Sequence, residues 1–163
     1  MLVQVRLASP DDAAAILEIW NAEVLDSTFV FELVPRTLAA QERWLAEHSG
    51  PHPALVAVEG GQVTGFACLS AYRSRPAYST TVEDSVYVGA EHRGQGVGRL
   101  LLAEVVHLAG AHGFHSIMAR IAGSNQASVA LHRSCGFELV GVEREVGRKF
   151  GRWLDVALMQ RLL

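Results

Sequence analysis

The sequence predicts a mixed α/β fold in which helices cover one central sheet. Its 163 residues are a length that usually forms one domain, and we expect this domain to span residues 1–163. The predicted elements follow one another as strand, two helices, three strands, helix, strand, helix and two strands, an order that suits such a sheet. Half of the residues are hydrophobic (50%) and the formal net charge is −3, so neither disorder nor a nucleic-acid-binding surface is expected.

The first strand and helix are placed by local signals. Apolar and polar residues alternate over residues 3–7, which predicts a half-buried strand. Ser9 is a suitable N-cap for the helix that follows, and Pro10 suits its first position. We expect this helix to stop near Asn21.

The next segment loses regular periodicity and is expected to form a connecting loop that carries Phe29 and Phe31. Thr37 then begins a second helix. The remaining predicted elements are a hairpin of strands at 54–59 and 63–69, a strand at 81–88, a helix from the glycine-rich segment to about residue 112, a strand at 116–121, a helix at 126–135, and two strands at 138–146 and 153–161 joined by a turn at 147–151.

A glycine-rich segment separates a predicted strand from the helix after it. Gly94, Gly96 and Gly98 stand at every second position, which lets the backbone approach a ligand and expose successive amides. Helix N-termini attract anions, so we expect the segment to bind a pyrophosphate, with charge added by Arg93 and Arg99. A turn without a ligand is the alternative. The segment lacks the Lys and the Ser or Thr of a P-loop, and its glycines have the wrong spacing for the dinucleotide fingerprint.

These residues resemble a known family. Residues 86–98, which end in RGQGVG, look like the cofactor motif of the GNAT N-acetyltransferases, Arg/Gln-x-x-Gly-x-Gly/Ala, and residues 125–137 are similar to the second cofactor element of that family. A closer likeness to the phosphinothricin and methionine sulfoximine acetyltransferases is carried by residues 29–32, 81–88 and 149–155. The likeness covers nearly the whole chain. It implies a mostly antiparallel central sheet of about seven strands flanked by about four helices.

The resemblance implies that acetyl-CoA is the co-substrate. No histidine pair has zinc-ligand spacing with cysteine or carboxylate partners, so no metal is expected. Backbone groups of the strand before the glycines would hold the pantetheine arm and the thioester, and the glycine-rich segment would hold the pyrophosphate. Asn125 would hydrogen-bond the pantetheine, although it also suits a helix N-cap. The implied cofactor residues are Val86, Tyr87, Val88, Arg93, Gly94, Gln95, Gly96, Val97, Gly98, Arg99 and Asn125.

The chemistry requires a base, because an amine attacks a thioester only when neutral and an α-amino group is mostly protonated at pH 7. The resemblance assigns this role to Glu83, and an edge carboxylate paired with an arginine is the alternative. We interpret Asp84 as a solvent-facing or turn carboxylate, although the resemblance places it along the substrate with Glu83 and Ser85. His132 stands where many GNAT members have Tyr; it could protonate the departing thiolate or relay a proton, and a half-buried helix histidine is an equal alternative.

The acceptor is expected to be a small amino acid. Two arginines in the loop before the base strand could form paired bonds to a carboxylate, although loop arginines are usually only solvated. Three aromatic residues could wall a small pocket or fill the core beneath a long loop. The expected substrate residues are Phe29, Phe31, Arg73, Ser74, Arg75, Tyr78, Glu83, Asp84 and Ser85.

The favoured function is direct transfer of acetyl to the α-amino group of an amino-acid analogue such as phosphinothricin, methionine sulfoximine or methionine sulfone. Cys68 and Cys135 occupy no nucleophile motif, so no acyl-enzyme is expected. The alternatives are acetylation of a protein N-terminus or a polyamine, and a silent acetyl-CoA sensor. The resemblance also implies a homodimer in which residues 149–155 approach the partner's active site. No signal peptide or membrane span is predicted, and we expect a cytoplasmic protein.

Overall fold

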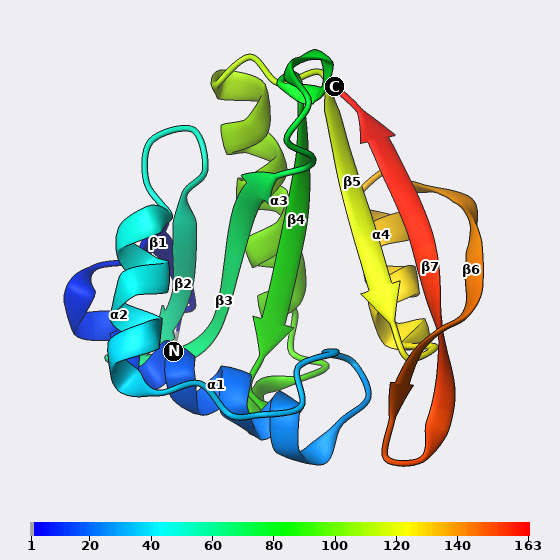
Figure 1. The fold of residues 1–163 in the computed structure, drawn as a ribbon. Coiled ribbons are helices and arrows are strands. Elements are labelled where there is room, and N and C mark those ends of the chain that lie inside the picture. Colours follow the sequence, from blue (N-terminus) through cyan, green and yellow to red (C-terminus); the bar gives the residue numbers. More distant parts are fainter. Residues whose placement is uncertain (1) are drawn as a thin grey trace.

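The computed structural model describes residues 2–163 and has a seven-stranded sheet at its centre (Figure 1). The strand order is β1-β2-β3-β4-β5-β7-β6, and every neighbouring pair is antiparallel except β4 and β5. The mixed, mostly antiparallel sheet expected from the sequence is therefore confirmed. The strands are β1 (Gln4–Leu7), β2 (Ala54–Glu59), β3 (Gln62–Ala71), β4 (Thr81–Val88), β5 (Ser116–Ala122), β6 (Glu138–Lys149) and β7 (Arg152–Leu162).

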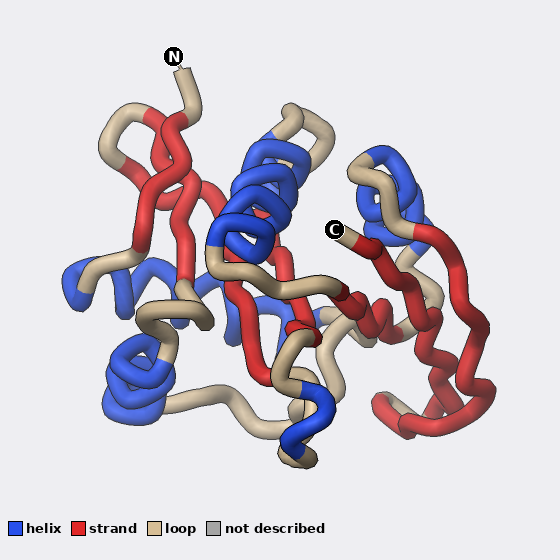
Figure 2. The backbone as a smooth tube through the Cα atoms, turned by 90° about the horizontal axis from the view of Figure 1, so that it is seen from above, coloured by secondary structure: helices blue, strands red, loops and turns tan. Residues whose placement is uncertain are grey.

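Four α-helices cover the two faces of the sheet (Figure 2). Helices α1 (Ala13–Asp26) and α2 (Leu38–Glu47) pack on one core, which includes Trp20 and Phe66. Helix α3 (Val97–Ala111), with α4 (Gln126–Ser134) beside it, packs on a second core around Leu101 and Val82. Within residues 2–163, no helix is long and apolar enough to cross a membrane.

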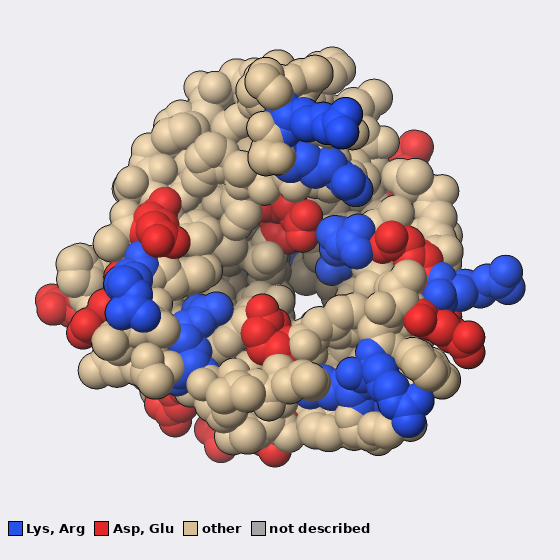
Figure 3. All heavy atoms as spheres, viewed as in Figure 1, with Lys and Arg blue, Asp and Glu red and all other residues tan. Residues whose placement is uncertain are grey.

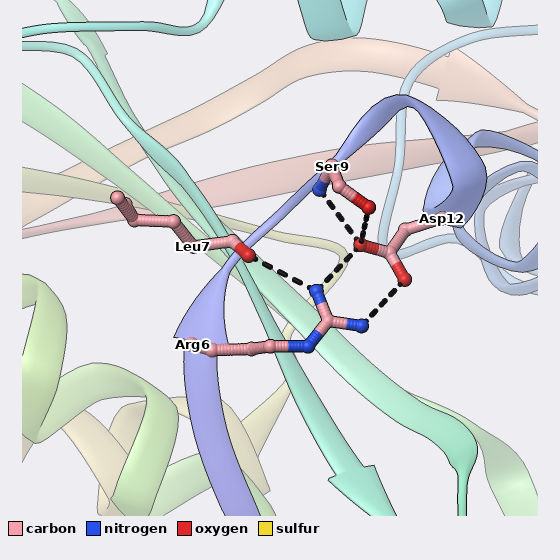
Figure 4. A network of polar contacts seen from close by, with 4 residues as sticks. All are labelled: Arg6, Leu7, Ser9 and Asp12. Carbon is pink, nitrogen blue, oxygen red and sulfur yellow. Dashed lines mark hydrogen bonds and ion pairs between the residues drawn. The ribbon is translucent and has the colours of Figure 1, made fainter.

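The connection from β1 to α1 is fixed by a cluster of polar contacts (Figure 4). The Arg6 guanidinium donates to both carboxylate oxygens of Asp12, at 2.7 and 2.9 Å, and the Ser9 amide donates to the same carboxylate at 2.7 Å. Ser9 is thus the N-cap of the 3-10 turn Pro10–Asp12 that leads into α1. The hydrogen bond from Arg6 holds the pKa of Asp12 below its usual value.

Helix α1 does not stop near Asn21, as the sequence indicated, but continues to Asp26. The Asn21 side chain is occupied elsewhere, because it accepts from the Arg36 amide at 2.8 Å and donates to the Arg36 carbonyl at 2.9 Å. It therefore does not compete for the helix backbone. Val24, one turn after Trp20, is buried and extends the apolar face of the helix.

The turn between the last two strands is shorter than expected. Residues 147–149, predicted to belong to a turn, pair with β7 as the end of β6, and the strand-to-strand connection is only Phe150 and Gly151. Both residues have positive φ, 50° and 70°, as in the two-residue turns that match the twist of a hairpin. The side chain of Lys149 is buried, which explains why a sequence of polar residues and glycines still forms a strand here.

The sheet divides between β4 and β5 (Figure 1). These strands pair over only four residues, from Thr81 opposite Ser116 to Asp84 opposite Ala119. Beyond this point β5 continues to pair with β7, while residues 85–88 have no strand partner on the β5 side. The two halves of the sheet diverge and leave space between them.

Residues 27–37, which join α1 to α2, cross the open end of this division (Figure 1). A Cβ at Gly123, just after β5, would lie 2.4 Å from the carbonyl oxygen of Thr28, so the loop passes directly against it. The Lys149 ammonium donates to the Val30 carbonyl at 3.0 Å. The loop thus bridges the two halves of the sheet.

Candidate active site

A cavity of about 620 Å³ occupies the space between β4 and β5. Its walls come from both strands, from the glycine-rich segment before α3, from α4 and from the loop after α1. Figure 3 shows the hollow between the strands, with both acidic and basic residues around it. The residues expected to bind a cofactor lie in this part of the molecule.

The glycine-rich segment forms one end of the cavity. Gly94 and Gly96 have left-handed backbone conformations, with φ of 73° and 87°. A Cβ on either would meet no protein atom within 4 Å, so the space beside them is open. Gly96 is the N-cap of the 15-residue helix α3, whose free amides and positive dipole end lie at the cavity. This arrangement fits the pyrophosphate of acetyl-CoA.

The unpaired edge of β4 forms a long wall of the cavity. Residues 85–88 line it, and on this side their backbone groups have no strand to pair with. Such an edge can bind an extended chain as an additional strand, which suits the amide groups of a pantetheine arm. Asn125 lies opposite and caps α4, because its side-chain oxygen accepts from the Ser128 amide at 3.1 Å. The side-chain NH₂ of Asn125 is left for a ligand.

Three of the expected cofactor residues contribute differently from the glycines. Arg93 lines the cavity, but its guanidinium forms an ion pair with the buried Glu23 of α1 and donates to the Val88 carbonyl at 3.0 Å. It therefore fixes the segment to α1 instead of offering a free charge. Gln95 donates to the Glu91 carbonyl, and the side chain of Val97 is buried in the core. Arg99 lines the cavity and is the exposed charge that remains there.

Asp84 is not the solvent-facing or turn carboxylate that we expected. It points to the α3 and α4 side of β4 and is buried, as is His132 of α4, and the two side chains meet with Asp84 Oδ2 2.9 Å from His132 Nε2. The strand alternates, and Val82 and Asp84 share its inner face. Both residues of the pair lie in the cavity wall. The second carboxylate oxygen of Asp84 is buried and has no partner among residues 2–163.

The protonation of this pair follows from its contacts. His132 Nδ1 lies 2.7 Å from the Ser128 carbonyl oxygen, which can only accept, so Nδ1 carries a proton. Burial lowers the pKa of His132, but the hydrogen bond and the charge of Asp84 outweigh it and raise the pKa overall. The pair therefore favours an imidazolium beside a carboxylate. Since both ring nitrogens are engaged, His132 can protonate a thiolate only by exchanging one of these bonds.

Glu83 lies on the opposite face of β4, with Ser85 and Tyr87. It is half-buried, and burial raises its pKa, assisted by the charge of Asp84 and opposed by Arg120 and Arg73. A raised pKa suits a general base that works near neutral pH. Glu83 does not line the large cavity itself, whereas Ser85, its neighbour on the same face, does.

The three aromatic residues expected in the substrate pocket are not brought together. Phe29 lines the large cavity. The ring of Phe31 packs so closely over Gly147 that a Cβ there would lie 2.5 Å from it. Tyr78 is separate from both and packs edge-on against Tyr72, with 5.5 Å between ring centroids.

The loop with Arg73, Ser74 and Arg75 is exposed and does not line the cavity. The Arg73 guanidinium stacks on Tyr72 and Tyr78, at 5.0 and 5.9 Å from the ring centroids. The positive charge of Arg73 nevertheless acts on Glu83, where it opposes the rise in pKa that burial causes. The charge of Arg73 therefore reaches Glu83, although the loop lines neither cavity.

A second cavity of about 280 Å³, which the sequence did not indicate, lies on the α1 and α2 side of the sheet. Ser85 and Tyr87 line both cavities, so the two spaces border the same part of β4. Its other lining residues are Trp20, Glu32, Arg36, Trp44, Phe66, Cys68 and Ser70. The two tryptophans fit the apolar faces of their helices, and nothing in their spacing distinguishes a cavity wall from ordinary core.

Comparison with known proteins agrees with this geometry. Residues 16–137 match the family described as "Acetyltransferase (GNAT) family". A phosphinothricin N-acetyltransferase from Streptomyces coelicolor is 40% identical over 99% of this chain and 96% of that protein. An L-methionine sulfoximine/L-methionine sulfone acetyltransferase from Pseudomonas paraeruginosa is also 40% identical, over 98% of this chain and 94% of its own length.

The fold is shared with solved structures that contain the co-substrate. A GNAT superfamily phosphinothricin acetyltransferase from Sinorhizobium meliloti, in complex with acetyl-CoA, superposes with a TM-score of 0.96 and 41% identity. The superposition covers 100% of this chain and 89% of that one. The chain belongs to the GNAT family and is an acetyl-CoA-dependent N-acetyltransferase.

Proposed function

We propose that this enzyme transfers the acetyl group of acetyl-CoA directly to the α-amino group of a small amino-acid analogue of the phosphinothricin, methionine sulfoximine or methionine sulfone type. The observation that carries the proposal is a pair of cavities that share Ser85 and Tyr87 of β4 as lining residues. One cavity, of about 620 Å³, includes Gly94 and Gly96 beside the N-terminus of α3, which suits the pyrophosphate of acetyl-CoA, and the other, of about 280 Å³, suits a small acceptor. The names of the relatives give the same class of acceptor.

Glu83 and the Asp84–His132 pair then have separate roles in the proton transfers of this reaction. Bound acetyl-CoA supplies a thioester carbonyl carbon for the amine to attack. Glu83 lies on the face of β4 that carries the second cavity, so its carboxylate takes the ammonium proton, directly or through one water. The Asp84–His132 pair fixes α4 against β4 on the other face and holds a proton close to the departing thiolate.

Direct transfer is supported by the state of the two thiols. Cys68 lines the second cavity but is buried, and burial raises its pKa to about 12, so it is not a nucleophile at neutral pH. Cys135 follows α4 and lines neither cavity. Neither thiol is therefore suited to carry an acetyl group.

Two further roles belong to the proposal. Arg73 and Arg75 would bind the α-carboxylate of the acceptor, since the charge of Arg73 reaches Glu83. A homodimer would bring residues 149–155 to the partner's site, which is supported by the exposure of Phe150 and Trp153, both 59%. Sedimentation at working concentration measures this directly.

The test is a CoA-release assay with L-phosphinothricin, L-methionine sulfoximine, L-methionine sulfone, spermidine and an alanine-terminated peptide, with the products identified by mass spectrometry. We expect N-acetylated amino-acid products and an enzyme that gains no mass with acetyl-CoA alone. Turnover of only the peptide or the polyamine would refute the acceptor class. A stable gain of one acetyl group on the enzyme would refute direct transfer.

A further inference from the structure

The second cavity contains a cation, Arg36, that forms no ion pair among residues 2–163. Arg36 and Glu32 are its charged lining residues, and within residues 2–163 no carboxylate lies at ion-pair distance from Arg36. Glu32 is exposed, and its charge acts on Arg36 only at longer range. Four of the nine lining residues are aromatic, and the Arg36 side chain is partly buried among them.

Arg36 is held firmly in this position. Its backbone amide and carbonyl are bonded to the Asn21 side chain, and its guanidinium lies 4.6 Å from the ring centroid of Trp20 and 5.5 Å from that of Trp44. Nη1 donates to the side-chain oxygen of the buried Gln41 at 2.7 Å. A guanidinium has five N–H donors, and this contact uses one. The other four N–H donors have no hydrogen-bond partner among residues 2–163.

Trp20 lines the same cavity, but its indole N–H is buried, so the Arg36 guanidinium is the charged donor that the cavity offers. Burial also lowers the pKa of Arg36, because an incompletely solvated cation without a counterion is unfavourable. An anionic ligand would offset this cost and accept from the guanidinium in two parallel bonds.

The cavity is also at the right distance from the reacting amine. Ser70 is paired with Glu83, and Cys68 with Ser85, so the cavity floor begins beside the proposed base. Residues two apart on one face of a strand are separated by about 7 Å, which is comparable with an extended side chain the size of glutamate. An acceptor with its amine near Glu83 can therefore reach past Ser85 toward Arg36.

We infer that this cavity is the subsite for the acceptor's side chain, and that Arg36 binds an anionic group at the end of it, a phosphinate or a carboxylate. The enzyme therefore prefers an amino acid with an anionic tail to one of similar size with a neutral tail. This inference rests on the proposed function, since it takes the acceptor to be an amino acid. Arg36 is then a specificity residue and takes no part in the proton transfers.

The test uses two acceptors of similar size, L-phosphinothricin with an anionic phosphinate and L-methionine sulfone with a neutral sulfone. The wild-type enzyme should have the higher kcat/KM for phosphinothricin. In Arg36→Gln the ratio of the two kcat/KM values should shift toward methionine sulfone by roughly ten- to a hundredfold, as for the loss of a charged hydrogen bond, and mostly through KM. Arg36→Lys should recover only part of the ratio, because an ammonium lacks the planar fork.

Arg43→Gln is the matched control, because Arg43 is an exposed arginine of α2 outside both cavities and its loss should leave the ratio unchanged. Equal losses on both acceptors in Arg36→Gln, or no loss on either, would overturn the inference. A wild-type preference for methionine sulfone would overturn it without any variant. If the wild-type enzyme acetylates neither compound, the proposed function itself is refuted. If it acetylates both and Arg36→Gln leaves the ratio of the two kcat/KM values unchanged, only the role of Arg36 is refuted.

Discussion

Replacing Asp84 by Ala tests the buried pair that joins β4 to α4. The change removes the carboxylate 2.9 Å from His132 Nε2 and leaves a buried imidazolium without its partner. Breaking a buried ion pair in this way costs about 3–5 kcal/mol. For a protein of this size that loss lowers Tm by about 6–20 °C. Thermal unfolding followed by circular dichroism measures the shift, and a Tm within a few degrees of wild type would refute the reasoning.

The milder change Asp84→Asn tests the charge of the same pair through its pH dependence. In wild type the folded-state pKa of His132 is raised above 6.5, so its stabilising contribution is complete below pH 6.5 and is lost as the pH rises through the folded pKa. Each unit of the shift contributes about 1.4 kcal/mol. In Asp84→Asn the carboxylate is gone and burial lowers the pKa of His132. Protonation of His132 then destabilises the folded protein, whereas in wild type it stabilises it.

The free energy of unfolding in urea should therefore differ most between wild type and Asp84→Asn below pH 6.5, and the difference should shrink toward pH 9. His48, whose pKa is lowered mainly by burial, contributes equally to both proteins and cancels in the difference. Asp26→Asn, an exposed aspartate at the end of α1, is the matched control and should show no such trend. A difference that is constant or grows with pH would contradict an imidazolium–carboxylate pair.

Three further changes test the proposed site. Glu83→Gln should keep acetyl-CoA binding and lower kcat, with part of the loss recovered at high pH where more amine is neutral; an unshifted pH profile with wild-type turnover would exclude Glu83 as the base. Gly96→Ala should cost about 1–2 kcal/mol of stability, because residue 96 has a left-handed φ of 87°. It should also weaken acetyl-CoA binding in calorimetry, since the new methyl points into the open cavity, and an unchanged affinity would place the pyrophosphate elsewhere. Arg73→Ala and Arg75→Ala should each lower kcat/KM about ten- to a hundredfold for an amino acid and less for its carboxamide, and equal effects on the two acceptors would remove the carboxylate contact.

The order of strands and helices was predictable because each element has its own local pattern. The errors came from contacts between distant residues. Asn21 looks like a helix end until its side chain is seen bound to the backbone of Arg36. Residues 147–149 look like a turn because their polar and glycine character hides a buried Lys149 and a glycine that accommodates an aromatic ring.

The site was predictable where it depends on backbone and much less where it depends on side-chain partners. The glycines before α3 predict an open backbone, and Gly94 and Gly96 have positive φ with open space beside them at the N-terminus of α3. The pairing of Arg93 with Glu23 and of Asp84 with His132 joins residues 70 and 48 positions apart, and nothing in either neighbourhood signals it. The second cavity depends on such long-range packing entirely.

The loop at residues 27–37 has a consequence for the order in which the protein is made. Lys149, which donates to the carbonyl of Val30, follows it by 119 positions, so this contact cannot form until almost all of the sheet has been translated. A nascent chain that has reached α4 already carries every glycine of the pyrophosphate segment and Asn125, yet lacks the hairpin on which the loop rests. Domains generally fold as units. The contact that fixes this loop to the C-terminal hairpin therefore depends on residues translated well after the glycine-rich segment.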